Sequence, residues 1–142
     1  MVDKEFINRK IKLIQEELAH LESFRGHSLD EVAKDFVKIA AVERLLEKII
    51  TRAIDINQHI LAEKGSGKEA VRRYEETFLQ LADLGVYSTE FAETIAPSAG
   101  LRNRLVHEYD NIDQKIIYSS VGEALEQYTK YCSYILQFAE NQ

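Results

Sequence analysis

The chain has few of the residues that cross-link, kink or anchor a polypeptide. Its 142 residues include one cysteine, Cys132, one proline, Pro97, and no tryptophan. A single cysteine cannot form an intrachain disulfide, and the scarcity of proline permits long helices. No apolar run reaches the roughly 18 residues of a membrane span, and the charged start lacks the apolar core of a signal peptide. These absences predict a cytoplasmic protein that does not associate with a membrane.

Basic residues are also in the minority. The sequence has 18 Lys and Arg but 24 Asp and Glu, so the formal net charge is −6. This balance argues against broad nucleic-acid binding, which usually needs a basic surface. Local basic clusters remain possible. One consists of Arg102 and Arg104, and the other of Lys64, Lys68, Arg72 and Arg73. The length predicts one domain, residues 1–142.

Apolar residues recur every three or four positions through most of the chain, which predicts an all-α fold. We expect an antiparallel bundle of about five helices: near 3–25, 28–63, 69–84, a segment from 88 that Pro97 interrupts, and 113 onward. The predicted N-caps are Asp3, Ser28, Ser88 and Asp113, and the predicted stops are Gly26, Gly65 and Gly85.

Aromatic residues are mostly assigned to the core by this periodicity. We expect Phe36 on the inner face of the longest helix and Tyr74 on that of the next. Three tyrosines near the end of the chain, Tyr128, Tyr131 and Tyr134, could stack on bases. Their helical spacing favours core or dimer-interface positions instead.

One polar stretch stands out, Leu101–Tyr109, which reads R-N-x-x-x-H-x-Y from Arg102. On an ideal helix Arg102, Asn103, Val106 and His107 form one contiguous patch, and Leu101 and Leu105 point elsewhere, as a core stripe would. The patch has no serine or cysteine nucleophile and no set of metal ligands. Arginine and histidine suit phosphoryl transfer in which the substrate supplies the nucleophile, as RNA does through its 2′-OH. An arginine and a histidine at this spacing on a surface helix are common, however, and usually have no function.

The motif Arg102-x4-His107-x-Tyr109 resembles that of the HEPN superfamily, in particular its HepT-like branch of toxins. The segments 74–85, 96–103 and 109–113 and the helix around 42–46 resemble the same branch. The resemblance implies a homodimeric helical bundle and a metal-independent endoribonuclease without a cofactor. It also implies a small nucleotidyltransferase antitoxin, of the MntA kind, as partner.

The resemblance also implies roles for individual residues. His107 would act as base or acid on RNA, and Arg102 would stabilise the transition state. Asn103 would orient His107 or bind phosphate, and Tyr109 would receive adenosine monophosphate from the antitoxin. The added phosphodiester and base would then exclude RNA and silence the enzyme.

Two questions stay open at the level of the sequence. Glu43 and Arg44 interrupt the apolar long helix, and either they form a surface ion pair or Glu43 orients Arg102 across the bundle. The competing function is a non-catalytic helical module that binds a nucleotide or a protein and partners a nucleotidyltransferase. The acidic net charge slightly favours that alternative. The remaining histidines, His20, His27 and His59, lack companions at zinc-ligand spacing, so we expect surface or capping roles.

Overall fold

The computed structural model of the chain describes residues 1–65, 73–107 and 112–142. Within these ranges it contains no strand, and its helices are α1 (Lys4–Glu22), α2 (Leu29–Lys34), α3 (Phe36–Lys64), α4 (Tyr74–Asp83), α5 (Thr89–Ile95), α6 (Ser98–His107) and α7 (Gln114–Glu140). The predicted all-α bundle is therefore confirmed. None of these helices is both long and apolar enough to cross a membrane.

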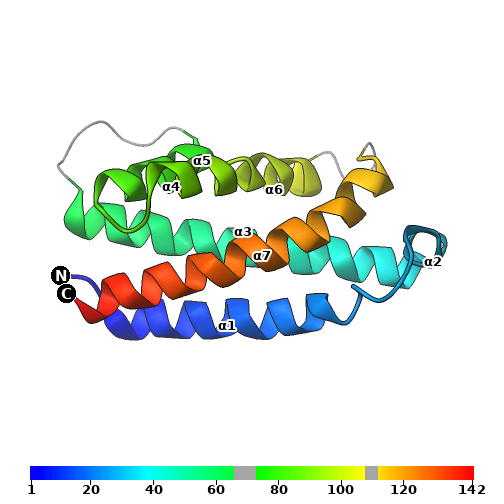
Figure 1. The fold of residues 1–142 in the computed structure, drawn as a ribbon, viewed down its shortest axis with the longest axis horizontal. Coiled ribbons are helices and arrows are strands. Elements are labelled where there is room, and N and C mark those ends of the chain that lie inside the picture. The colour runs from blue at the N-terminus through cyan, green and yellow to red at the C-terminus, as the bar shows by residue number, and fades with distance from the viewer. Residues whose placement is uncertain (66–72, 108–111) are drawn as a thin grey trace.

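Three long helices form one side of the bundle and three short ones the other. Helix α1 packs against α3 and α7 and runs antiparallel to both, while α4, α5 and α6 follow one another along the opposite side of α3 (Figure 1). Helix α6 also contacts α3 directly. The polar stretch is thus carried by a short helix on the outside of the longest one.

The core contains two fully buried tyrosines that also make polar contacts. The hydroxyl of Tyr131 donates to the carbonyl of Ala53 at 3.0 Å and to Asn57 Oδ1 at 2.6 Å, and Asn57 Nδ2 donates to Thr77 Oγ1 at 3.0 Å. These contacts join α7, α3 and α4. Tyr128 shares a hydrogen bond of 2.6 Å with Ser98. The core positions of the terminal tyrosines are confirmed for these two, while Tyr134 is half-buried.

The predicted N-caps are all present. The side chains of Asp3, Ser28, Ser88 and Asp113 each accept a hydrogen bond from a backbone N–H in the first turn of the helix that follows. Gly85 ends α4 with φ of 80°, a conformation that glycine adopts at little cost. The N–H of Val86 donates to the carbonyl of Leu81 and that of Gly85 to Ala82, which completes a Schellman motif.

The helices outnumber the predicted five because two expected helices are divided. The expected helix 28–63 breaks at Asp35, whose extended backbone ends α2 and whose carboxylate accepts the N–H groups of Val37 and Lys38 at the start of α3. The second break, between α5 and α6, lies at Pro97, where the sequence predicted an interruption. The break turns Phe36 outward, so that it is 82% exposed and its predicted core position was wrong.

Two other details of the prediction need correction. Helix α1 ends at Glu22 with Ser23 as its C-cap, so Gly26 is not the stop. Helix α4 begins at Tyr74, and the expected start at Glu69 lies outside the described residues. Tyr74 was expected in the core but is 39% exposed, because it is the first residue of α4, where its ring lies beside the guanidinium of Arg102.

Candidate active site

Helix α6 divides its residues between the core and the surface as the sequence predicted. Ala99 and Leu105 are buried, whereas Asn103 and His107 are exposed and Arg102 is half-buried. The helix is fastened to the bundle at its start, where Ser98 bonds both Tyr128 and the carbonyl of Ile95. The polar side chains of the motif therefore face outward from a fixed helix.

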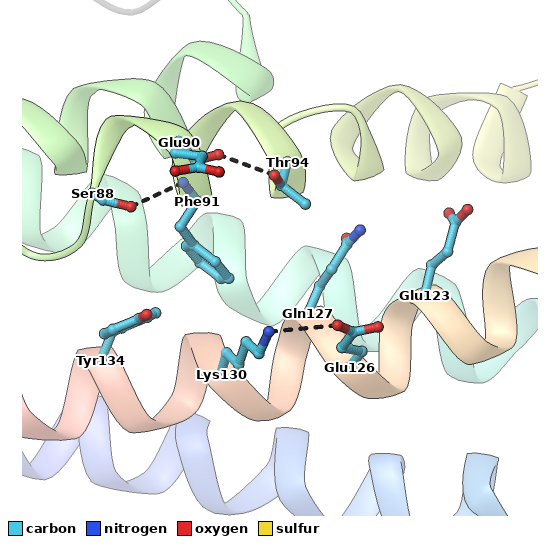
Figure 2. A pocket seen from close by; sticks show the side chains of 9 residues that line it. All are labelled: Ser88, Glu90, Phe91, Thr94, Glu123, Glu126, Gln127, Lys130 and Tyr134. Atoms are coloured by element: carbon cyan, nitrogen blue, oxygen red, sulfur yellow. Dashed lines mark hydrogen bonds and ion pairs between the residues drawn. The ribbon is translucent and has the colours of Figure 1, made fainter.

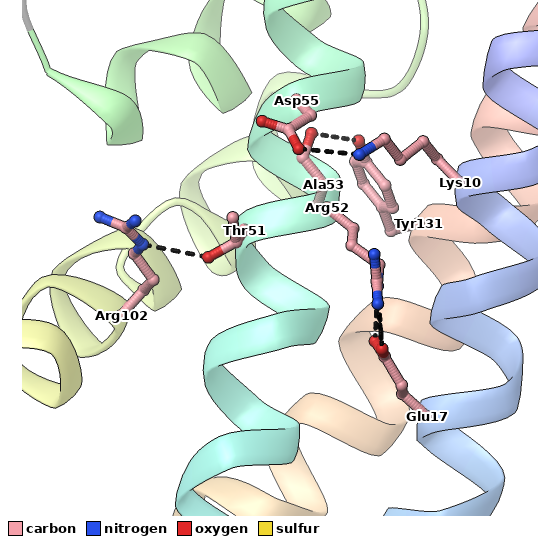
Figure 3. Close-up of polar contacts among 8 residues, drawn as sticks. All are labelled: Lys10, Glu17, Thr51, Arg52, Ala53, Asp55, Arg102 and Tyr131. Atoms are coloured by element: carbon pink, nitrogen blue, oxygen red, sulfur yellow. Dashed lines mark hydrogen bonds and ion pairs between the residues drawn. The ribbon is translucent and has the colours of Figure 1, made fainter.

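Arg102 is held by groups from three helices. Its Nε donates to Thr51 Oγ1 of α3 at 3.1 Å, one terminal nitrogen donates to Asn103 Oδ1 of α6 at 3.3 Å, and its guanidinium carbon lies 5.3 Å from the centre of the Tyr74 ring of α4. Figure 3 shows the terminal nitrogens pointing away from α3. Among the described residues no carboxylate pairs with Arg102. The guanidinium is thus oriented with its charge available to an anion.

His107 is the last residue of α6 and is exposed. It follows Arg102 by five residues, which corresponds to a rise of about 7.5 Å along a helix. A single extended substrate along the outer side of α6 can therefore reach both side chains. Tyr109, the third member of the motif, lies outside the described residues.

A hollow of about 320 Å³ opens beside Arg102, lined by Arg73, Tyr74, Glu75, Ala99, Gly100 and Asn103. Arg73 and Glu75 form an ion pair of 3.6 Å within it. Of the second predicted basic cluster, Lys68 and Arg72 lie outside the described residues. Of its two described members, Lys64 and Arg73, Arg73 lines this hollow.

A second hollow, also about 320 Å³, lies between α5 and α7 (Figure 2). Three carboxylates line it, Glu90, Glu123 and Glu126, against one ammonium, Lys130, which bonds Glu126 at 3.4 Å. Carboxylates repel phosphate, so this hollow does not suit RNA. The site that does suit an anion is the outer side of α6.

Two contacts of Arg102 were missed from the sequence. Thr51 is a single hydroxyl on a mostly apolar helix, and Tyr74 occupies a position that the apolar periodicity assigns to the core. Both depend on which residues of distant segments meet in the fold, and no local pattern marks them. An unexpected polar residue between apolar neighbours is the one weak signal for Thr51.

Glu43 and Arg44, the two residues of the long helix whose roles the sequence left undecided, do not bond Arg102. Arg44 is exposed and pairs with Glu47 at 3.1 Å. Glu43 is half-buried, and this burial raises the pKa of its carboxyl. No hydrogen bond joins either residue to Arg102 in the described ranges, so the orienting role considered for Glu43 falls to Thr51.

The other candidate groups are accounted for structurally. His59 accepts the N–H of Asp3 at 2.9 Å, and His27 bonds Glu31 at 3.1 Å. The carboxylate of Asp55 bonds Lys10 at 3.0 Å. Burial raises the pKa of Cys132 to about 12, so its thiol stays protonated and is a poor nucleophile. Across the described ranges no three His, Cys, Asp or Glu side chains gather at a possible metal site.

Known structures share this arrangement of helices. The crystal structure of a toxin–antitoxin with AMP-PNP matches with a TM-score of 0.82 and 22% identity, over 92% of this chain and 97% of that one. A tri-AMPylated HEPN toxin from Shewanella oneidensis, in complex with its MNT antitoxin, matches with a TM-score of 0.81 and 23% identity, over 92% and 96%. At these identities the matches establish the fold.

Closer relationships are seen in sequence. The tRNA nuclease HepT of Aphanizomenon flos-aquae is 40% identical over 98% of this chain and 96% of its own length. A putative RNase of Archaeoglobus fulgidus is 31% identical over 67% of this chain and 70% of its own length. The family model "Ribonuclease HepT-like" matches residues 14–135. With the helical fold, these matches confirm the resemblance: the chain belongs to the HepT-like ribonuclease family and is an endoribonuclease.

Proposed function

We propose that this endoribonuclease is the toxin of a toxin–antitoxin pair and cleaves RNA, with tRNA as its substrate class, by attack of the 2′-OH on the neighbouring phosphate. The observation that carries the proposal is Arg102, held by Thr51, Asn103 and Tyr74 with its terminal nitrogens pointing away from α3, five residues before His107 on the same helix. The tRNA nuclease from Aphanizomenon flos-aquae supports the choice of tRNA, and the toxin–antitoxin structures support the toxin role.

The reaction needs one proton removed and one supplied. The 2′-oxygen loses its proton and bonds to phosphorus, the bond from phosphorus to the 5′-oxygen breaks, and that oxygen gains a proton. The products are a 2′,3′-cyclic phosphate and a 5′-hydroxyl. Arg102 stabilises the extra negative charge of the pentacoordinate phosphate, and Asn103 holds Arg102 and offers its amide N–H groups to phosphate oxygens. His107 acts as base or as acid, because an imidazole can accept a proton at one ring nitrogen and donate one from the other.

One histidine cannot readily do both in one step, which is why we propose a homodimer with the motif helices near the two-fold axis. A second His107 then supplies the other proton transfer. Apolar surface at the same end of the bundle supports this arrangement. Phe36 and Val37 at the start of α3 are 82% and 73% exposed, and Ile116 near the start of α7 is 40% exposed. The starts of α3 and α7 and the end of α6 lie at one end of the molecule (Figure 1).

Cleavage by the purified protein tests the catalytic roles. Arg102→Ala and His107→Ala should each lower cleavage by at least 100-fold, the usual loss on removal of a group that stabilises the transition state. Both should retain the helical circular dichroism spectrum, since neither side chain is in the core. Arg25→Ala is the matched control, because it removes the same charge from an exposed residue of the turn after α1.

Two further outcomes decide the mechanism. Cleavage should persist in EDTA, because the proposed steps use the guanidinium and the imidazole. Activity that is lost in EDTA and restored by a divalent metal would refute the mechanism. A wild-type protein that cleaves no RNA yet binds a nucleotidyltransferase would instead support the non-catalytic module.

The homodimer is tested by mixing two inactive chains. If Arg102 of one chain and His107 of the other serve one site, heterodimers of Arg102→Ala and His107→Ala should recover part of the activity. Each variant alone, taken through the same unfolding and refolding, is the control. A protein that is monomeric by light scattering and still fully active would contradict the proposal.

We further propose that a nucleotidyltransferase antitoxin silences the enzyme by modifying Tyr109. The phenolic oxygen attacks the α-phosphorus of ATP, loses its proton and releases pyrophosphate, which leaves an adenylyl group on the tyrosine. Its phosphodiester adds a negative charge two residues from His107, and its base adds bulk, so RNA is excluded by charge and by volume. The tri-AMPylated toxin from Shewanella oneidensis shows that a protein of this fold accepts such groups.

Mass spectrometry after co-expression with the antitoxin and ATP tests this switch. Added mass should map to Tyr109, and Tyr109→Phe should stay toxic but escape neutralisation. Tyr134→Phe is the control, since Tyr134 is a half-buried phenol on α7 and should remain irrelevant to neutralisation. Added mass on another residue, or a Tyr109→Phe protein that is neutralised like the wild type, would exclude Tyr109 as the switch.

A further inference from the structure

The hollow beside Arg102 has no role in the reaction proposed above. Its volume of about 320 Å³ falls in the range of small-molecule sites, roughly 300–1,000 Å³. Tyr74, Gly100 and Asn103 line it, and Arg102 does not. The hollow therefore adjoins the phosphate-binding guanidinium and can hold a different part of the same substrate.

The walls of the hollow favour an uncharged group. Its two charged residues, Arg73 and Glu75, pair with each other at 3.6 Å and contribute no net charge. Its aromatic residue, Tyr74, is 39% exposed, and it is already fixed in place by the guanidinium stacked 5.3 Å from its ring centre. An exposed and immobilised aromatic ring is a platform on which flat rings stack.

A directional hydrogen-bond donor is also present. Asn103 Oδ1 accepts from Arg102 at 3.3 Å, which leaves the amide nitrogen as the outward end of the side chain. Among the described residues no acceptor bonds this nitrogen. One N–H of this amide can donate to a phosphate oxygen, as proposed above, and the other to the edge of a nucleobase.

Gly100 provides the open floor of the hollow. Glycine inside a helix costs about 1 kcal/mol relative to alanine. Neither the backbone nor the packing of α6 requires it, because its φ is not positive and a Cβ placed there would meet no atom within 4 Å. What glycine provides at this position is the space in the hollow itself.

We infer that this hollow is a nucleobase subsite, which takes the base next to the scissile phosphate. The base stacks on Tyr74 above Gly100 and receives a hydrogen bond from Asn103, while the phosphate lies at Arg102. The inference rests on the proposed function and assigns a specificity-determining role to Tyr74 and Gly100, which lie outside the motif.

Filling the hollow tests the inference without touching Arg102. Gly100→Leu places a side chain in it, and Gly122→Leu is the matched control, because Gly122 is also an exposed glycine inside a helix with no atom near its absent Cβ. The substrates are an oligoribonucleotide that the wild type cuts and versions with one abasic ribose beside the cut. For the wild type, one abasic position should lower kcat/KM tenfold to a hundredfold, the usual contribution of a stacked base.

The two variants should then differ. On the intact substrate, Gly100→Leu should lower kcat/KM by the same tenfold to hundredfold. On the substrate with that abasic position, it should show no further loss of kcat/KM. Gly122→Leu should behave like the wild type on both substrates. Equal cleavage by the two variants, or the same abasic penalty in both, would overturn the subsite and leave the proposed function standing.

If the wild type cleaves no RNA, the proposed function fails and binding tests the hollow separately. AMP and ribose 5-phosphate are the probes, and they differ by the base alone. Tighter binding of AMP that Gly100→Leu abolishes and Gly122→Leu keeps would support a nucleobase site. Equal binding of the two probes to the wild type would overturn it.

Discussion

Thr51 is the residue through which α3 positions Arg102, and its hydroxyl can be removed with little change in shape. The contact is one hydrogen bond of 3.1 Å from Arg102 Nε to Thr51 Oγ1. Thr51→Val keeps the branched side chain and deletes the acceptor. We expect the guanidinium to lose its fixed direction, while its charge and its stacking on Tyr74 remain.

The size of the effect follows from the environment of the bond. A hydrogen bond to a charged group contributes about 1.5–3 kcal/mol when buried. Arg102 and Thr51 are both half-buried, so water can replace part of the interaction. We therefore take a value just below this range, about 1.4 kcal/mol, which corresponds to a tenfold loss in kcat/KM. The free energy of unfolding should change by less than about 1 kcal/mol.

Single-turnover cleavage of an RNA substrate and denaturant unfolding measure the two quantities side by side. Thr51→Ser is the control, because serine retains the hydroxyl and should retain most of the activity. A Thr51→Val protein with wild-type cleavage would show that Thr51 does not position Arg102. Equal losses in Thr51→Ser and Thr51→Val would attribute the effect to packing instead.

Three further substitutions test the fold. Asn57→Leu removes the hydrogen bonds to Tyr131 and Thr77 and should lower the free energy of unfolding by about 2–3 kcal/mol in urea titrations. Gly85→Ala forces a left-handed backbone on alanine and should cost about 1 kcal/mol, measured as a lower Tm. Burial raises the pKa of Glu43 in the folded state, so the free energy of unfolding falls as the pH rises from the unfolded to the folded pKa, and the loss is complete above both. Glu43→Gln should therefore raise the free energy of unfolding at pH 7 and leave it unchanged near pH 4, in guanidinium titrations at both values.

Local features of the fold could be predicted from the sequence because they depend on neighbouring residues. A capping side chain such as Asp3 or Ser88 bonds an N–H three residues away, and an apolar stripe shows which side of a helix is buried. The break at Asp35 was missed, although aspartate is a strong N-cap, because the apolar periodicity runs on across it. At that point capping prevailed over periodicity.

The candidate site could be predicted only in part, for a reason of distance along the chain. Arg102, Asn103 and His107 belong to one helix, so their shared exposure follows from its period. The contact between Arg102 and Thr51 spans 51 residues, and Tyr74 meets Arg102 because of how α4 lies beside α6. Such encounters arise from the packing of whole helices, which the sequence of any one segment does not contain.

The buried hydrogen-bond network from Tyr131 through Asn57 to Thr77 fixes the position of α4 along α3. A slip of α4 along α3 by one turn, about 5.4 Å, would separate Asn57 from Thr77 and leave the amide N–H groups of Asn57 unpaired in an apolar interior. Thr77 also donates to the carbonyl of Tyr74, so the same hydrogen-bond network extends to the residue whose ring lies beside the guanidinium of Arg102. The alignment of α4 is therefore discrete: the ring lies under the guanidinium or the helix is undocked, with no stable intermediate position.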